Sequence, residues 1–112
     1  MEAESHPFFH ADLRVGTVLT CEPNPKARKP AYVITVDFGP DIGVRTSSAQ
    51  ITHLAEADQV VGRQVIGVVN LPPKRIAGVK SEFLTLGPVN ADGLCLALLT
   101  VDRPMPNGLR IG

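Results

Sequence analysis

The chain has 112 residues, and two separate hydrophobic cores would leave each half too small to be stable, so we expect one domain spanning residues 1–112. Lys and Arg together number 11, as do Asp and Glu, and this formal net charge of zero excludes a protein that holds nucleic acid through its overall charge. Hydrophobic residues make up 44% of the chain but aromatic residues only 4%, so the core must be built from aliphatic side chains.

The N-terminal sequence, MEAESHPFFHADLR, is acidic and lacks the apolar stretch of a secretory signal. The rest of the chain contains no apolar run of the length that is needed to span a bilayer. Cys21 and Cys95 are two isolated cysteines in apolar segments, and they do not form a disulfide framework. We therefore expect a soluble, cytoplasmic protein that has no membrane partner and whose two thiols are buried.

The first strand is predicted over residues 13–21 (LRVGTVLTC), where apolar and β-branched residues alternate, and the prolines at 23 and 25 end it. A second strand is predicted over residues 31–38 (AYVITVDF), closed by a Gly-Pro turn, and a short third strand over residues 43–47. The chain is therefore expected to begin with three consecutive strands.

A short helix is predicted next, over residues 48–57, because Ser47 or Ser48 can cap it and several of the following residues tolerate a helix. Residues 64–69 (QVIGVV) are almost entirely apolar, which predicts a fourth strand that is buried on both faces.

A long loop over residues 70–80 leads to a predicted fifth strand at 81–86 and a sixth at 94–101. Three strands, a short helix and two further strands are typical of an OB fold, a barrel whose closure leaves no long sheet edge exposed. We therefore predict an all-β, five-stranded OB barrel with a short helix between strands 3 and 4 and extra N- and C-terminal segments. A split barrel or a small sandwich would give similar periodicity.

Positive charge is concentrated in two stretches that contain no Asp or Glu, residues 26–29 and 74–80. The remainder of the chain holds five basic and eleven acidic residues. In the predicted fold these stretches are the loops with which OB folds hold oligonucleotides. The alternative is that basic residues simply favour exposed loops. The residues concerned are Lys26, Arg28, Lys29, Lys74, Arg75 and Lys80.

Three further side chains close to these stretches complete the candidate RNA site. Tyr32 begins the second strand, where its ring would either stack on a base or cover one end of the barrel. The amide of Asn70 would read a base edge or cap the loop, and the hydroxyl of Ser81 would donate to a phosphate.

Three blocks of sequence closely resemble the CsaA family, which belongs to the tRNA-binding OB superfamily. They are ADLRVGTV near the N-terminus, ARKPAYVITVDFGPDIGVRTSSAQIT in the middle, and NLPPKRIAGVKSEFLTLG. The third block contains the Pro-x-x-(I/L)-x-G-x-x-S loop of the domains that are appended to some methionyl- and phenylalanyl-tRNA synthetases, here Pro73 to Ser81. The resemblance covers residues 8–112.

This resemblance implies an OB fold, a homodimer with export-chaperone character, and binding of structured tRNA without strict sequence readout. It also implies that Phe8, Phe9 and the C-terminal segment form the dimer contacts. The matching blocks contain Arg28, Lys29, Tyr32, Asn70, Arg75, Lys80 and Ser81.

We find no residue set for catalysis, for a metal or for a cofactor. His6 and His10 are four residues apart, but Pro7 lies between them and no Cys or acidic residue completes a ligand set. Residues 39–43 lack the Lys and the following helix of a phosphate-binding loop. We therefore expect a protein that is not an enzyme, with no catalytic residue, no metal and no cofactor.

The sequence favours a tRNA-binding module that grips folded RNA through residues 26–29 and 74–80 and works as a homodimer. The alternative is a chaperone that holds unfolded peptides or export precursors at the dimer interface. The two hypotheses differ in salt dependence, which is steep for phosphate contacts and weak for apolar contacts.

Overall fold

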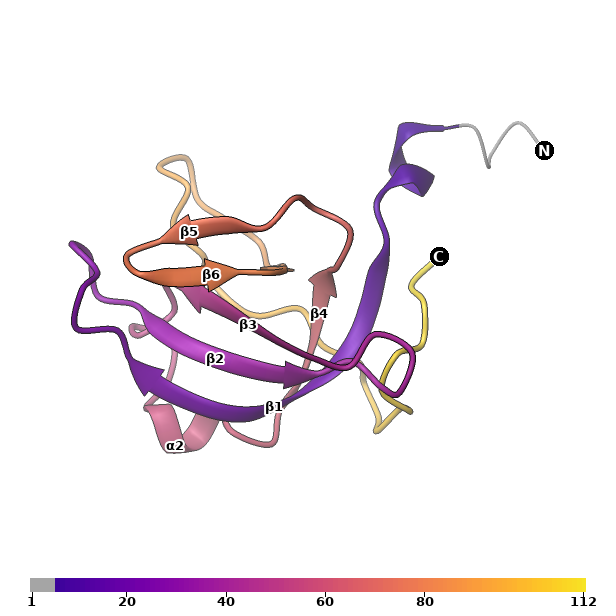
Figure 1. The fold of residues 1–112 in the computed structure, drawn as a ribbon, viewed down its shortest axis with the longest axis horizontal. Coiled ribbons are helices and arrows are strands. Elements are labelled where there is room, and N and C mark those ends of the chain that lie inside the picture. Colours follow the sequence, from indigo (N-terminus) through magenta and orange to yellow (C-terminus); the bar gives the residue numbers. More distant parts are fainter. Residues whose placement is uncertain (1–5) are drawn as a thin grey trace.

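The computed structural model describes residues 6–112, which form the predicted all-β barrel (Figure 1). Five antiparallel strands make one sheet in the order β3-β2-β1-β4-β7, and β5 and β6 form a separate hairpin. The elements are the 3-10 helix η1 (Pro7–His10), β1 (Leu13–Pro23), β2 (Tyr32–Asp37), β3 (Val44–Ala49), α2 (Ala57–Val60), β4 (Gln64–Val68), β5 (Lys74–Ile76), β6 (Val79–Ser81) and β7 (Leu84–Thr85).

Alternation along the strands builds the core, as the sequence predicts. Ile34 and Val36 of β2 are fully buried, and the residues that alternate with them, at positions 33, 35 and 37, are half-buried. Phe38 and Phe83 lie within the aliphatic core as an edge-to-face pair, with their ring centroids 5.0 Å apart. With Tyr32, three of the five aromatic side chains are therefore used inside the barrel.

The segment from Val79 to Thr85 brings the two edges of the sheet together. The backbone N–H of Glu82 donates to the carbonyl of Thr46 in β3 at 2.8 Å, and two residues later Leu84 pairs with Val68 in β4. Because one segment reaches both edges, the barrel is nearly closed (Figure 1).

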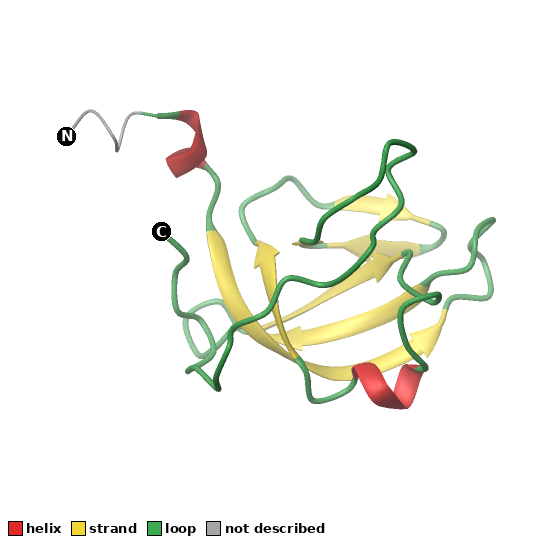
Figure 2. Cartoon of the chain, turned by 180° about the vertical axis from the view of Figure 1, so that it is seen from behind, coloured by secondary structure: helices red, strands yellow, loops and turns green. Residues whose placement is uncertain are grey.

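Both ends of the described chain lie at the same end of the barrel (Figures 1 and 2). The C-terminal segment runs along β1, where the backbone N–H of Val15 donates to Leu109 and that of Ile111 donates to Leu13. This segment covers a second apolar cluster, in which Ile111 packs on buried residues of β1 and β4. The extra C-terminal segment predicted from the sequence thus completes the core at this end, whereas η1 buries no residue.

The helix predicted over residues 48–57 lies further along the chain, at α2. Ser47 and Ser48 belong to β3 because pairing with β2 outweighs the local helix preference. Glu56 starts the helix instead, through a capping box with Gln59. The position between strands 3 and 4 is as predicted, and only the boundaries were wrong.

The loop predicted over residues 70–80 contains the β5–β6 hairpin. Its two turn residues, Ala77 and Gly78, have φ values of 47° and 81°, which suit a two-residue hairpin turn. The fifth strand predicted at 81–86 is shortened to β7, because Ser81 ends β6 and Glu82 bonds to Thr46 of β3.

The sixth strand predicted over residues 94–101 is wrong. The segment forms one isolated bridge, between Cys95 and Val89. Its backbone N–H groups donate to the chain just after β7, Leu96 to Pro88 at 2.8 Å and Leu99 to Leu86 at 2.9 Å, but no regular ladder forms. Leu98 packs on the core, whereas Leu94, Leu96 and Leu99 are exposed, so the apolar pattern reflects partial burial without strand pairing.

Candidate nucleic-acid interface

The two basic stretches lie side by side at one end of the barrel (Figure 1). The first is in the connection between β1 and β2, residues 24–31, which we call the basic loop, and the second is the β5–β6 hairpin, which we call the basic hairpin. The side chain of Lys26 lies against the hairpin turn, since a Cβ built on Gly78 would be 2.9 Å from Lys26 Cδ. Stretches that are far apart in sequence therefore form one surface, the basic surface.

Asn24, which sequence reasoning missed, joins the loop to the hairpin. Its side chain is buried, and its Nδ2 donates to the carbonyl of Ala77 at 3.4 Å. Its Oδ1 accepts from the backbone N–H of Lys26 at 3.1 Å, an arrangement that tightens the loop. The sequence signal was an Asn between two prolines, which predicts a turn but not a contact with another element.

Two of the three basic side chains of the basic hairpin share one face, and Lys74 lies on the other. Arg75 and Lys80 are opposite each other in the register, so their side chains share a face. Ile76 and Val79 form the next pair and point the other way. Like charges directly opposite each other disfavour the hairpin, and a bound anion would relieve that repulsion.

The charges of the basic surface are not neutralised by carboxylates within the part of the chain that the structure describes. The ion pairs there join Arg14 to Asp12 and Arg103 to Asp102, outside this surface. All six predicted basic residues are exposed, which leaves their charge available to phosphate groups: Lys26, Arg28, Lys29, Lys74, Arg75 and Lys80.

Tyr32 does not belong to the exposed surface. Its ring is packed in the core with 6% of the residue exposed, and its hydroxyl donates to the carbonyl of Ala55 at 2.8 Å. Of the two predicted roles, the structural one fits, because a base has no free ring face on which to stack. The period of two that Tyr32 shares with Ile34 and Val36 was the sequence signal for this burial.

Asn70, which is exposed, and Ser81 also make hydrogen bonds within the chain. The amide of Asn70 accepts from the backbone N–H of Asp12 at 2.9 Å and donates to the carbonyl of His10 at 2.6 Å. The hydroxyl of Ser81 lies 2.7 Å from that of Ser47 and fastens β6 to β3. Neither the base contact predicted for Asn70 nor the phosphate contact predicted for Ser81 is supported by these arrangements.

A groove of about 470 Å³ lies between the basic loop and the basic hairpin. Lys26, Arg28 and Lys29 line one side of it, and Ile76 lines the other. Its size is within the range of ligand sites in proteins, and its basic wall favours an anionic ligand.

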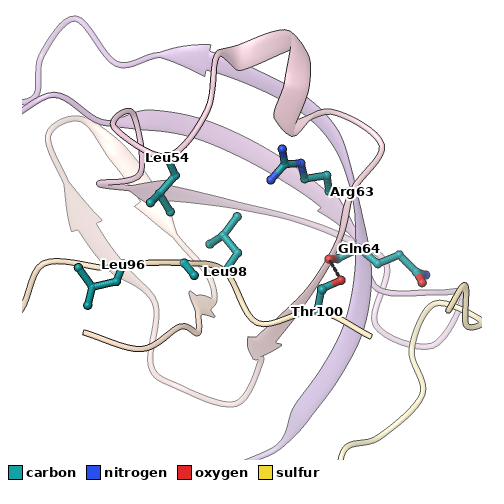
Figure 3. A pocket seen from close by; sticks show the side chains of 7 residues that line it. Leu54, Arg63, Gln64, Leu96, Leu98 and Thr100 are labelled. Atoms are coloured by element: carbon teal, nitrogen blue, oxygen red, sulfur yellow. Dashed lines mark hydrogen bonds between the residues drawn. The ribbon is translucent and has the colours of Figure 1, made fainter. Parts of the chain in front are cut away.

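A larger hollow of about 570 Å³ lies near α2 and is mixed in character (Figure 3). Leu54, Leu96 and Leu98 provide apolar lining, while Arg63 and Thr100 provide polar groups. The hydroxyl of Thr100 donates to the backbone carbonyl of Gln64 at 2.6 Å, which ties this segment to β4. This hollow shares no lining residue with the groove at the basic surface.

Two histidines have structural contacts. The ring of His6 accepts from the backbone N–H of Phe8 and caps η1, and His53 Nε2 lies 2.6 Å from the carbonyl oxygen of Cys95. Within residues 6–112, no group of three or more His, Cys, Asp or Glu side chains is arranged to hold a metal ion. The same residues include no helix that is long and apolar enough to cross a membrane.

The two cysteines differ in environment. Cys21 is buried, and burial raises the pKa of its thiol to about 11, with a smaller contribution from the charge of Glu22. Cys95 is only partly buried, so the prediction that both thiols are core residues is right for Cys21 alone. At neutral pH, Cys21 is therefore a protonated core side chain.

A family model described as "Putative tRNA binding domain" matches residues 13–110, nearly the whole barrel. The chain belongs to this tRNA-binding domain family. The match includes both stretches of the basic surface, and the resemblance to the tRNA-binding OB superfamily that the three sequence blocks indicate is confirmed.

Members of known structure include proteins described as CsaA chaperones. The chaperone CsaA from Bacillus anthracis is 45% identical with a TM-score of 0.86, and the match covers 94% of each chain. The CsaA chaperone protein from Picrophilus torridus is 42% identical with a TM-score of 0.84, again over 94% of each chain. The barrel and its terminal segments are thus shared with these proteins.

The domain also occurs within larger enzymes. The methionine–tRNA ligase of Porphyromonas gingivalis is 38% identical over 99 residues, which cover 88% of this chain but 14% of the ligase. The chain therefore spans about a seventh of the length of this curated relative, and the similarity concerns one domain of the enzyme.

Proposed function

We propose that this chain is a non-catalytic module that binds structured RNA, and tRNA in particular, at the basic surface. The contact between Lys26 and Gly78 carries the proposal, because it joins two acid-free basic stretches into one exposed surface. Membership of the tRNA-binding domain family supports tRNA as the ligand. A cytoplasmic location and a single domain remain predictions from the sequence.

The basic surface is suited to the RNA backbone. The guanidinium groups of Arg28 and Arg75 can each donate two parallel hydrogen bonds to a phosphate, and the lysines add point charges. Tyr32 and Ser81 make hydrogen bonds within the fold, and the exposed amide of Asn70 bonds to the backbone of His10. Binding is therefore expected to depend on the shape and charge of the backbone more than on base sequence.

We also propose that the protein forms a homodimer through the end of the barrel that carries both termini. Phe8 and Phe9 form an edge-to-face pair there, and they are 46% and 36% exposed. Leu109 is also exposed, and Arg110 bonds to the carbonyl of Phe9. Exposed apolar groups gathered in this way are typical of an interface. A dimer of this kind would leave the hairpin ends free (Figure 1).

A second candidate function is the binding of unfolded peptides or export precursors. The observation that favours it is the hollow near α2, where Leu54, Leu96 and Leu98 face a ligand-sized space (Figure 3). The related CsaA proteins are described as chaperones. Peptide binding of this kind would rely on apolar burial and would change little with salt.

Titration of labelled total tRNA and of an unfolded export precursor, each at two salt concentrations, tests the proposal. If the six basic side chains all contact phosphates, the tRNA affinity should fall about a thousandfold between roughly 50 and 200 mM salt. Affinity for the precursor should hardly change. A tRNA affinity that is insensitive to salt would contradict binding at the basic surface.

A further inference from the structure

The groove at the basic surface continues into a second hollow. This neighbouring hollow has a volume of about 370 Å³, and it shares three lining residues with the groove: Ser48, Gln50 and Ile76. Ser48 is in β3, Gln50 follows it, and Ile76 is in β5. The two spaces are therefore adjacent, between the edge of the barrel and the basic hairpin, and together we call them the channel.

The two halves of this channel differ in chemistry. The first half has the basic side chains of Lys26, Arg28 and Lys29 on its wall. The second half has no charged side chain in its lining, and it includes exposed leucines, Leu84 and Leu94. A ligand that fills the channel must therefore be anionic at one end and apolar at the other.

Polar groups lie at the junction and in the apolar half. The amide of Gln50 lines both halves and makes no side-chain hydrogen bond with any other residue in 6–112. The hydroxyl of Thr85 lines the apolar half and is a buried oxygen without a hydrogen-bond partner in the described chain. The Thr85 oxygen is closed to a ligand, whereas the exposed amide of Gln50 offers a donor and an acceptor to a ligand with a polar edge.

A nucleotide has this order of groups, since its phosphate is joined through a sugar to a base with apolar faces and a polar edge. An A-form duplex does not, because its bases are stacked inside and its backbone presents phosphates and hydroxyls. An apolar peptide would fill the second half but leave the three basic side chains without anions.

We propose that this channel receives an unpaired nucleotide of the bound RNA, with its phosphate at the basic loop and its base beside Leu84 and Leu94. The inference rests on the proposed function and narrows its ligand to RNA that exposes at least one unpaired nucleotide. Recognition of this kind tolerates different bases, because every base has an apolar face.

Two RNA probes test this inference: a single strand without self-complementarity, and a blunt duplex that carries the same number of phosphates. At equal salt, the single strand should bind more tightly than the duplex, because only the single strand can bury an unpaired base against the leucines. Leu94→Ser should remove most of this advantage and leave duplex binding unchanged. Leu99→Ser is the matched control, because Leu99 is 45% exposed in the same segment but lines neither half of the channel.

Alkylation of Cys95 gives an independent measurement, because this thiol lines the apolar half and Cys21 is buried and protonated. The single strand should slow the alkylation of Cys95, whereas the duplex should not. This protection would not result from a general change in stability.

The remaining outcomes overturn the inference in distinguishable ways. Equal binding of the two probes, unchanged by Leu94→Ser and steeply salt-dependent, would overturn the nucleotide channel and leave the proposed function standing. If Leu94→Ser weakens binding of an unfolded peptide but not of the single strand, the channel is a peptide site. If the folded protein binds neither RNA probe nor tRNA, the proposed function fails together with the inference.

Discussion

The side chain of Lys26 lies across the turn of the basic hairpin at Gly78, so that an added Cβ at residue 78 would be 2.9 Å from Lys26 Cδ and 3.4 Å from Nζ. Gly78 has a φ of 81°, a left-handed conformation that glycine adopts without strain. Because these residues belong to different basic stretches, their contact sets the spacing between the charges of the loop and those of the hairpin.

Gly78→Ala should therefore affect both stability and binding. The left-handed conformation should lower the free energy of unfolding by about 1 kcal/mol, and displacement of the Lys26 ammonium should weaken tRNA binding. Urea denaturation and tRNA titration measure the two effects.

Gly43→Ala is the control for the backbone effect. Gly43 has a φ of 83°, and no atom lies within 4 Å of the position of its Cβ. This variant should show a similar decrease in stability but keep its tRNA affinity. If both variants bind tRNA as the native protein does, the spacing of Lys26 and the hairpin is unimportant.

Tyr32→Leu should lower the Tm by roughly 5 °C or more, because it removes both the ring from the core and the hydrogen bond to Ala55. Tyr32→Phe, which keeps the ring, should show a smaller decrease. At a temperature where the protein is folded, both variants should bind tRNA normally. Loss of tRNA affinity in Tyr32→Leu without a change in Tm would show that the ring stacks on a base.

Replacement of Phe8 and Phe9 together with Asp should shift the protein toward monomer. The two rings are exposed together at the end of the barrel with both termini, where charge would prevent apolar association. Sedimentation at micromolar concentration measures the change. Val61→Asp, a charge placed on an exposed valine beside α2, should leave the dimer intact. A native protein that sediments as a monomer would refute the proposed interface.

The buried thiol of Cys21 predicts a loss of stability at high pH. Its pKa is raised to about 11 from 9.0, so the unfolded chain gives up the proton at a lower pH than the folded protein does. The stabilisation that follows from this raised pKa is complete below about pH 9, and it disappears as the pH rises through about 11. Urea midpoints across this range should therefore fall with pH.

Cys21→Ala should make that decrease smaller. Part of the decrease should remain, because burial also raises the pKa of Tyr32. Deprotonation of this phenol therefore also lowers the stability of the folded protein as the pH rises. If the native protein and Cys21→Ala lose stability in parallel, the Cys21 thiol is not the group responsible.

Much of the barrel could be predicted from the sequence because alternation marks strands with one buried face. β1 and β2 follow this pattern closely, and β4 is the apolar run between them and the basic hairpin. The β5–β6 hairpin was missed because Ala77 and Gly78 are not one of the strong turn pairs. The false strand at 94–101 shows that an apolar run can also arise from partial packing on the core, which periodicity alone does not distinguish from a strand.

The positive charge of the candidate site could be predicted from the sequence, but the hydrogen bonds that join its residues to distant segments could not. The absence of acidic residues marked both basic stretches, since that depends on composition alone. The contacts of Asn24 with Ala77 and of Asn70 with His10 depend on long-range packing. For that reason Asn24 was overlooked and Asn70 was included in the RNA site.

The most direct measurement is the salt dependence of tRNA affinity for the double variant Arg28→Ala, Arg75→Ala. Both arginines are exposed, so the fold should change by no more than about half a kcal/mol. We expect weaker binding of all tRNA sequences alike. The slope of log affinity against log salt should become shallower by roughly one for each phosphate that the variant no longer neutralises.

The matched control removes the same charge elsewhere. Arg63 bonds to the carbonyl of Gln59 and Arg103 pairs with Asp102, both outside the basic surface. The double variant Arg63→Ala, Arg103→Ala should keep nearly the native affinity and slope. The opposite pattern, an unchanged slope without Arg28 and Arg75 and a shallower one without Arg63 and Arg103, would contradict RNA binding at the basic surface.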